Sequence, residues 1–456
     1  MKQIIASTLF FSILLNFVQA QDTVKYTRAQ VAADIKVFIT NAADIHPNLY
    51  HDISKDRLAA KTDSLVKTLP DSLTDLQTYS AFARATAFIN EGHTGVNLPR
   101  SLRAQRKSGV FMAIPLQATD FDGKYLIGNV LAPNNRLEGV KITAINNMPV
   151  SELFNSISTM RGGLSSFRRV SAVNNFRFYL AAIGVKQPYV INYIDRDKKS
   201  STVRVDDMSE KDYLAALSKP ASLQSFTFNV IDGGVGYLNF RSMDNYQGFT
   251  KFCDSVFELA DNQHLDKLIV DLRENGGGNS QLGWYLLNKI TTRPFRMAGE
   301  SGRKVSQQFK DHITANKAVY GANNVLLSEP TGSFYKMGDT ALYKPTDISH
   351  PFKGKVCFLI SPRTFSSANM LAATVKDFKL ATLIGEPTGE PANDYGELCD
   401  IKLPNTGFLA FTSTTIWVRP NNNKTDNNPI FPDYIVKRSP TGDDNVLQFA
   451  EKWLGK

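Results

Sequence analysis

The spacing of apolar residues changes along the chain. Between residues 28 and 90 apolar positions recur every three or four residues, in RAQVAADIKVFITNAADI and again in DLQTYSAFARATAFINE. This period predicts amphipathic helices, and Gly92 ends the second of them. From residue 109 to about 205 the pattern changes to short apolar runs separated by turn residues, which predicts strands. The chain therefore begins with a helical segment and continues into a β-rich one.

A third pattern begins near residue 225, where short apolar runs of strand length alternate with longer helical ones. The expected strands are GGVGYLNFRSM, DKLIVDL, KVCFLIS and LATLIG, and the expected helices are QGFTKFCDSVFELADN, SQLGWYLLNKI and SSANMLAATVKDF. This alternation predicts a mostly parallel sheet covered by helices. Residues 293–352 interrupt it with a long polar insertion, which we expect to form a cap or lid.

These patterns together predict a multidomain α/β protein. The expected boundaries are a helical domain at 21–105, a β-rich insert at 106–208 and an α/β core at 209–456. Within the insert, LEGVKITAINNMPVSEL reads as a strand, an Asn-Asn turn and a return into a helix. This run resembles part of a PDZ domain, which would bind a peptide by adding it as a strand to an exposed edge. A β-rich domain of another kind is the alternative.

The first twenty residues have the three parts of a secretory signal peptide. Lys2 provides the positive charge, an almost charge-free run extends from Ile4 to Val18, and Val18-Gln19-Ala20 fits the small-x-small cleavage pattern. The run is short for a membrane span, and no cysteine follows it to accept a lipid. We therefore expect export to the periplasm or medium without stable membrane insertion, and an uncleaved anchor is the alternative.

Composition narrows the classes of function. Apolar residues make up 42% of the 456 residues and charged ones 21%, as in ordinary globular proteins. The formal charge of +9 is spread without a long Lys/Arg block, which favours a solvated basic surface over nucleic-acid binding. The cysteines Cys253, Cys357 and Cys399 form no metal-binding pattern. We expect neither a metal nor an organic cofactor.

The loop DLRENGGGNS, residues 271–280, places three consecutive glycines after a predicted buried strand. Glycines adopt positive φ and expose their backbone N–H groups. At the start of a helix such a loop can bind an anion or a developing oxyanion. A tight turn is the plain alternative.

A second strand-to-helix junction lies in LISPRTFSSANML, residues 359–371. Ser366 and Ser367 stand where the strand turns into the helix, which is the position of a nucleophile elbow, although G-x-S-x-G is absent. The alternative is that a serine caps the helix. Of the six histidines, His93 is set apart by its place in EGHTG, directly after a helix.

The succession EGHTG, DLRENGGG, TFSSAN and GEPT resembles the tail-specific, or C-terminal processing, serine peptidases. The resemblance extends from about residue 80 to 435 and implies a ClpP/crotonase-like core. It also implies that Ser366 is the nucleophile and that the Ser367 N–H, with Gly277 or Gly276, forms the oxyanion hole.

The general base follows from a departure within that family. One branch uses a lysine about 25 residues after the serine, where this chain has Pro391, so a lysine base is excluded there. The tricorn-like branch uses a histidine from before the PDZ-like insert, and His93 occupies that place. Asp426, in TDNNPIFPD, matches the acidic residue that orients the base, with Thr94 as a supporting contact. Asp394 and Glu397 remain alternative carboxylates.

The resemblance implies an exported serine endopeptidase that forms an acyl-enzyme at Ser366. Its substrates would be peptides or unfolded proteins, cut near their C-termini. The alternatives are a catalytically silent peptide- or lipophile-binding protein on the same scaffold, an adaptor acting through the insert, and an esterase. The sequence leaves the oligomeric state open.

Overall fold

The computed structural model describes residues 24–132, 134–217, 224–321, 324–338, 341–346, 349–439 and 443–455. The predicted signal peptide at 1–20 lies outside these residues. Within the described ranges, no helix combines the length and the apolar character needed to cross a membrane.

The N-terminal part is helical, as the apolar period predicts, and the first helix has the predicted bounds. Its elements are β1 (Val24–Thr27), α1 (Arg28–Ile45), α2 (Lys55–Thr68), β2 (Ser72–Thr74), α3 (Asp75–Ala87), β3 (Gly95–Val96) and α4 (Arg100–Lys107). Helices α1 and α3 each begin with a capping box, Thr27 with Gln30 and Thr74 with Gln77, which satisfies N–H groups that the first turn leaves free. Helix α3 and β3 bracket His93.

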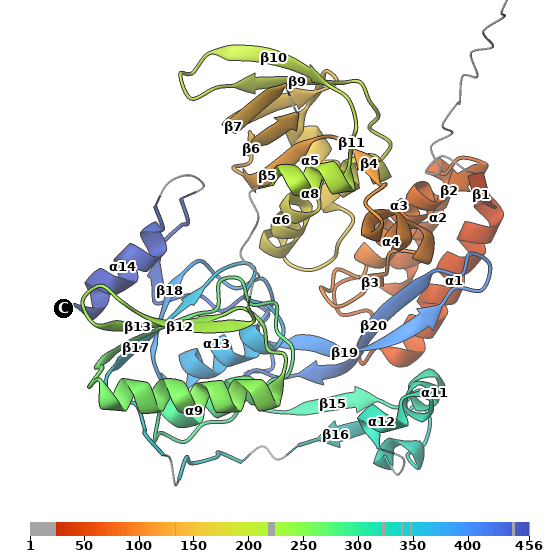
Figure 1. The fold of residues 1–456 in the computed structure, drawn as a ribbon. Helices are drawn as coiled ribbons and strands as arrows, with labels where there is room; N and C mark the ends of the chain where they lie inside the picture. The colour runs from red at the N-terminus through yellow and green to blue at the C-terminus, as the bar shows by residue number, and fades with distance from the viewer. Residues whose placement is uncertain are drawn as a thin grey trace, which may run out of the picture.

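The insert is a sheet with helices along one side (Figure 1). The sheet has the order β10-β9-β7-β6-β5. Its elements and their neighbours are β4 (Met112–Ala113), β5 (Leu116–Phe121), β6 (Leu126–Ala132), β7 (Asn135–Ile145), β8 (Met148–Pro149), α5 (Val150–Ser158), α6 (Ser165–Asn174), α7 (Phe176–Ala182), β9 (Tyr189–Ile194), β10 (Ser200–Val205), β11 (Met208–Ser209) and α8 (Glu210–Ala216). Asn146 and Asn147 both have positive φ and form the predicted turn.

The expectation of strands throughout 109–205 is wrong for α6 and α7. Val173, Phe176 and Leu180 are buried at three- and four-residue intervals, so this stretch has the helical period. Helix α6 contacts the core, where Phe167 stacks on Phe365 and Asn174 accepts from Arg363.

The core contains the predicted parallel sheet, in the order β12-β13-β14-β17-β18-β21, with only the edge strand β12 antiparallel. Its strands are β12 (Phe226–Ile231), β13 (Val235–Phe240), β14 (Lys267–Asp271), β17 (Lys355–Ile360), β18 (Thr382–Gly385) and β21 (Tyr434–Ile435), and its helices are α9 (Tyr246–Asn262), α10 (Gln281–Ile290), α13 (Ser367–Asp377) and α14 (Asn445–Leu454). Alternate strand residues pack on α9, α10 and α13 on one face and on α14 on the other. The mixed α/β multidomain fold is confirmed.

A second sheet joins the core to the N-terminal helices. It has the order β16-β15-β20-β19, with β3 added beside β20. Its strands and the nearby helices are β15 (Ser301–Lys304), α11 (Gln307–Ala315), α12 (Lys317–Tyr320), η2 (Val325–Leu327), β16 (Phe334–Met337), β19 (Asp394–Lys402) and β20 (Leu409–Trp417). The 293–352 insertion thus contributes two strands of this sheet, and its Lys304 ammonium donates to the carbonyl of Ala43 in α1, at 2.7 Å. Its role as a lid stays a prediction.

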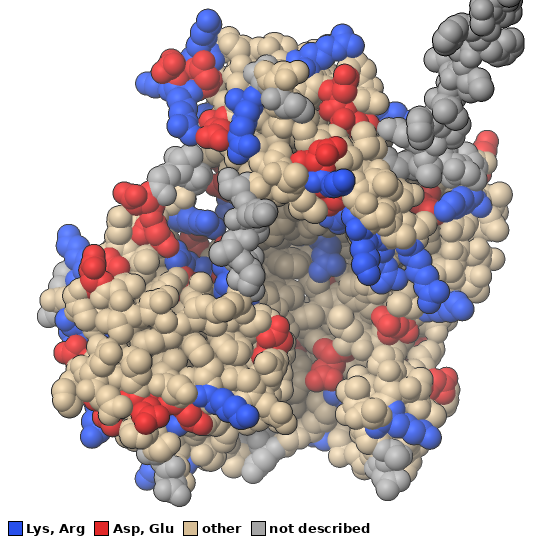
Figure 2. All heavy atoms as spheres, in the orientation of Figure 1, with Lys and Arg blue, Asp and Glu red and all other residues tan. Residues whose placement is uncertain are grey.

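The space-filling view shows the molecule hollowed between the insert, the core and the N-terminal helices (Figure 2). Lys and Arg side chains gather beside this hollow over α4, which carries the exposed residues Arg100, Arg103 and Lys107. The insert stands above the core in this orientation, and the residues described next lie where the three parts meet.

Candidate active site

Ser366 caps the N-terminus of α13 in a strained backbone conformation, with φ 54° and ψ −129°. Residues other than glycine avoid this region, and holding one there costs on the order of 1–3 kcal/mol. The strain places the serine at the positive end of the helix dipole. The Ser366 backbone N–H donates to Glu390 Oε2 at 2.7 Å, so a buried carboxylate helps to hold the turn.

The glycine loop packs directly against this turn. Gly277 has φ +95°, and a Cβ built on it would lie 2.7 Å from Ser366 Cβ. The Phe365 N–H donates to the Asn275 carbonyl at 3.1 Å, and the Thr364 hydroxyl donates to the Leu272 carbonyl at 2.8 Å. The two unusual loops seen in the sequence therefore form one structure.

Substituting Gly277 by alanine is expected to lower the free energy of unfolding by about 1–3 kcal/mol, because the positive φ and the close approach both disfavour a side chain. Gly276→Ala is the matched control, since no heavy atom lies within 4 Å of its added Cβ. Thermal or denaturant unfolding of the two variants checks this. Equal losses of stability would contradict the close packing of Gly277 on Ser366.

The backbone N–H groups around the serine turn differ in whether they already have an acceptor. The Gly277 N–H donates to the Asn275 side-chain oxygen at 2.8 Å, so it is engaged within the loop. The N–H groups of Ser367, Gly276 and Gly278 have no acceptor in the described part of the chain. The Ser367 hydroxyl donates to the Gly278 carbonyl at 2.6 Å, which ties the helix start to the loop.

His93 lies beside the nucleophile turn, held between two carboxylates. Its Nδ1 is 2.9 Å from Glu390 Oε1 and 3.6 Å from Glu91 Oε1. The contact with Glu390 is a close ion pair without hydrogen-bond alignment. The His93 ring packs on Phe365, with ring centroids 4.7 Å apart. No hydrogen bond joins it to the Ser366 hydroxyl among the described residues, and such bonds often tighten only when substrate binds.

The electrostatics of His93 favour its charged form. Burial by itself lowers the pKa of His93, but the carboxylates of Glu390 and Glu91 outweigh burial and raise that pKa well above 6.5. Burial raises the pKa of Glu91, but the contacts from His93, His46 and Thr94 lower it to about 2. His93 and Glu91 each favour the charged form of the other.

Glu91 anchors the loop that carries His93. Its carboxylate accepts from the His93 N–H and from the Thr94 hydroxyl, each at 2.5 Å, and from the Ser413 hydroxyl at 3.2 Å. The Thr94 hydroxyl also lies 2.9 Å from that of Thr412. Thr94 thus supports Glu91 and joins the histidine loop to β20.

Two more buried titratable groups surround this cluster. Burial and the charge of Glu390 raise the pKa of Asp394 well above its ordinary value, which favours its protonated form. Burial lowers the pKa of His46 to about 4, so its ring is neutral. The His46 Nε2 lies 4.0 Å from Glu91 Oε2, which brings the end of α1 to the edge of the site.

Asp426 lies in a different set of contacts from the one expected. Its carboxylate pairs with Arg419 and accepts from the N–H of Asn428 at 3.1 Å. The carboxylates at His93 are Glu390 and Glu91, which sequence reasoning missed. Glu91 stands two residues before His93 in EGHTG, and Glu390 stands one residue before the excluded lysine position. Closeness in the sequence to His93 and to the lysine position was the signal that could have identified Glu91 and Glu390.

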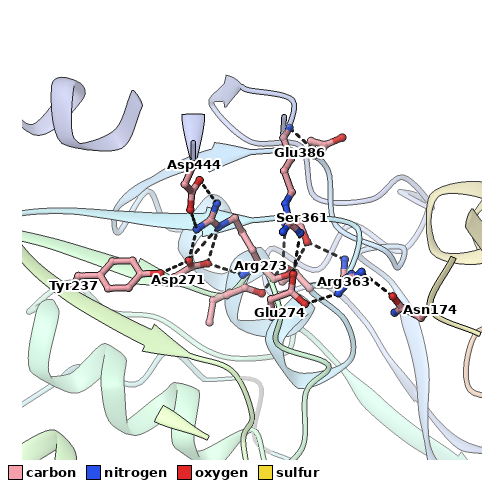
Figure 3. A network of polar contacts seen from close by, with 12 residues as sticks. Asn174, Tyr237, Asp271, Arg273, Glu274, Ser361, Arg363, Glu386 and Asp444 are labelled. Carbon is pink, nitrogen blue, oxygen red and sulfur yellow. Dashed lines mark hydrogen bonds and ion pairs between the residues drawn. The ribbon is translucent and has the colours of Figure 1, made fainter. Parts of the chain in front are cut away.

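An arginine network joins the serine loop and the glycine loop to each other and to the insert (Figure 3). Arg363, from the nucleophile loop, pairs with Glu274 of the glycine loop at 2.6 Å and donates to Asn174 of α6 at 2.7 Å. The Ser361 hydroxyl donates to the Arg273 carbonyl at 2.6 Å. Phe167 of α6 stacks on Phe365, with centroids 4.4 Å apart. The insert therefore contacts the turn that carries Ser366.

Glu91, His93 and Glu390 could also hold a metal ion, because one ligand atom from each lies within 4.8 Å of the others. The same geometry is explained by a proton on His93 Nδ1 between two carboxylates. The arrangement of a strained serine, a partly buried histidine and a buried carboxylate is suited to acyl transfer.

Comparison with known proteins identifies a family and similar folds. Residues 234–436 match the model of peptidase family S41. No curated protein matches the chain. Among solved structures, mature CPAF has a TM-score of 0.62 at 14% identity, covering 94% of this chain and 96% of that one. Mature CPAF in complex with lactacystin has a TM-score of 0.65 at 13% identity, covering 94% and 97%. At these identities the likeness concerns the fold, and it extends over nearly the whole chain.

Proposed function

The chain is a serine-type peptidase of the tail-specific family S41, and from this premise we propose that Ser366 is its nucleophile, His93 its general base and Glu390 the carboxylate that orients the base. One observation carries the assignment. Glu390 lies 2.9 Å from His93 Nδ1 through one oxygen and accepts the Ser366 N–H at 2.7 Å through the other. A single carboxylate therefore sets the positions of both reacting residues.

The proposed reaction is acyl transfer. With Nδ1 held by Glu390, the Nε2 of neutral His93 takes the proton of the Ser366 hydroxyl as its oxygen attacks a peptide carbonyl. The N–H groups of Ser367 and of Gly276 or Gly278 hold the oxyanion, each contributing roughly 3 kcal/mol to the transition state. The protonated ring then gives its proton to the leaving amine. Water, deprotonated by the same ring, attacks the acyl-enzyme, and the ring returns that proton to the Ser366 oxygen as the acid is released.

We assign peptides and unfolded proteins as substrates, cut near their C-termini, because the PDZ-like insert stands over the nucleophile turn through Phe167 and Arg363. The character of residues 1–20 supports export. Mature CPAF is known in complex with lactacystin, which makes lactacystin a compound to test here.

The test is reaction of the protein, residues 21–456, with a fluorophosphonate probe and with a pool of unfolded proteins. The expected result is covalent labelling at Ser366 and new termini detected by mass spectrometry. Because Gly277 N–H is engaged by Asn275, a catalytically silent binding protein is the competing function. It predicts peptide binding without labelling and without new termini.

A further inference from the structure

A pocket of about 460 Å³ lies between α10, the 293–352 insertion and β20. Its volume lies in the range of pockets that bind small ligands. Its lining includes the large apolar side chains of Trp284, Met297, Met337, Tyr343 and Trp417. A pocket with two tryptophans, a tyrosine and two methionines is suited to a bulky apolar group.

A row of paired residues on the second sheet links the pocket to the catalytic cluster. Asp394 of β19 is paired with Trp417 of β20, Trp417 with Ser301 of β15, and Ser301 with Met337 of β16. Directly opposite residues in antiparallel strands direct their side chains to the same face. One row of side chains therefore begins at Asp394, beside Glu390, and continues along the wall of the pocket.

Other lining residues come from α10 and from the 293–352 insertion. Trp284 lies on α10, which follows the glycine loop, and packs against Tyr343 of the insertion with ring centroids 4.9 Å apart. Met297 reaches α13, where its sulfur lies 3.6 Å from the Thr374 hydroxyl. Thr374 is two turns from Ser367, or about 11 Å along the helix. An extended peptide covers that distance in about three residues.

The two charged residues of the lining, Arg296 and Glu300, both contact protein groups. Glu300 pairs with Lys424 at 2.8 Å, and the Arg296 guanidinium donates to the carbonyl of Pro420 at 2.7 Å. A charged substrate side chain therefore gains no unpaired partner here, while an apolar one is removed from water.

We propose that this pocket is a specificity subsite, which binds a bulky apolar side chain of the substrate about three residues from the scissile bond. The inference rests on the proposed peptidase function and adds to it the substrate class, namely peptides with an aromatic, leucine or methionine residue at that distance. The insertion at 293–352 then contributes to specificity through Met297, Met337 and Tyr343.

The test compares peptides that differ only in carrying phenylalanine or alanine at each of the four positions on either side of the cleaved bond. For the wild-type protein, phenylalanine at one position about three residues from the scissile bond is expected to raise kcat/KM by roughly 10- to 100-fold relative to alanine. In Trp417→Ala and in Met337→Ala that preference is expected to fall below about 3-fold, through KM more than kcat, because ground-state binding is lost. Tyr434→Ala, an exposed aromatic residue on β21, is the control and keeps the preference.

A binding measurement separates this inference from the proposed function. In Ser366→Ala protein, Trp284 and Trp417 report on the pocket by fluorescence, and the phenylalanine peptide is expected to change that signal while the alanine peptide does not. Binding without cleavage by the wild type leaves the pocket standing and refutes the peptidase. Cleavage without a preference, or the same preference in both pocket variants, overturns the subsite.

Discussion

Ser366→Ala is expected to lower kcat for peptide hydrolysis by roughly 10⁴-fold or more, since the residual rate without a nucleophile comes from binding and the oxyanion hole alone. The hydroxyl has no hydrogen-bond partner among the described residues, so its removal is expected to change the free energy of unfolding by less than about 0.5 kcal/mol. Kinetics with a cleaved peptide and thermal unfolding of the same preparation check both parts.

Ser366→Gly provides a control that separates chemistry from strain. Position 366 has φ 54°, which glycine adopts without cost. Ser366→Gly is therefore expected to be as inactive as Ser366→Ala, and its free energy of unfolding is expected to be higher than that of Ser366→Ala by about 1 kcal/mol. Retained hydrolysis in either variant would refute the nucleophile. A glycine variant no more stable than the alanine variant would refute the strained turn.

Glu390→Gln is expected to lower kcat by roughly 10²- to 10⁴-fold, because the amide keeps the shape but no longer stabilises the imidazolium or fixes the tautomer of His93. The matched control is Asp426→Asn. Asp426 pairs with Arg419 rather than with His93, so its substitution is expected to change kcat less than about 5-fold. Steady-state kinetics of the two variants decide between the carboxylate found in the structure and the one suggested by the sequence motif.

The pH dependence of the reaction tests independently whether Glu390 is the carboxylate that raises the pKa of His93. His93 accepts a proton only when neutral, and the carboxylates of Glu390 and Glu91 outweigh burial to raise its pKa well above 6.5. Activity should therefore increase with pH and reach half its maximum above pH 6.5. Removing the Glu390 charge lowers the pKa of His93, so the acid limb in Glu390→Gln should move to lower pH. A limb that stays in place, or that moves upward, would exclude Glu390 as the partner.

Much of the fold could be predicted from residue patterns because the decisive interactions are local. The period of apolar residues placed α1 at Arg28–Ile45, as found, and the strand and helix order of the core followed from alternating apolar runs. Ser366 and the glycine loop were selected because glycine and a serine at a strand-to-helix junction have specific backbone roles. The helices α6 and α7 were missed because short strand signals on both sides hid their period.

The orienting carboxylate could not be chosen from the sequence. Asp394, Glu397 and Asp426 were all plausible by position, and Glu390, next to Pro391 at the place of the absent lysine, was not among the candidates. His93 and Glu390 are about 300 residues apart in the chain and 2.9 Å apart in the structure. Their contact depends on how the N-terminal helices, β3 and the loop before β19 pack together. Local propensities do not encode this packing.

The sequence by itself determined the α/β class, the order of elements and the two loops that carry Ser366 and the glycines, because each depends on residues near one another in the chain. Only the tertiary structure decided that Glu390 and Glu91 hold His93, that Asn275 engages the Gly277 N–H, and that Trp417 stands in a row with Asp394. These contacts arise where the second sheet joins the core to α1 and α3, and burial there sets the charges on which the proposed chemistry depends.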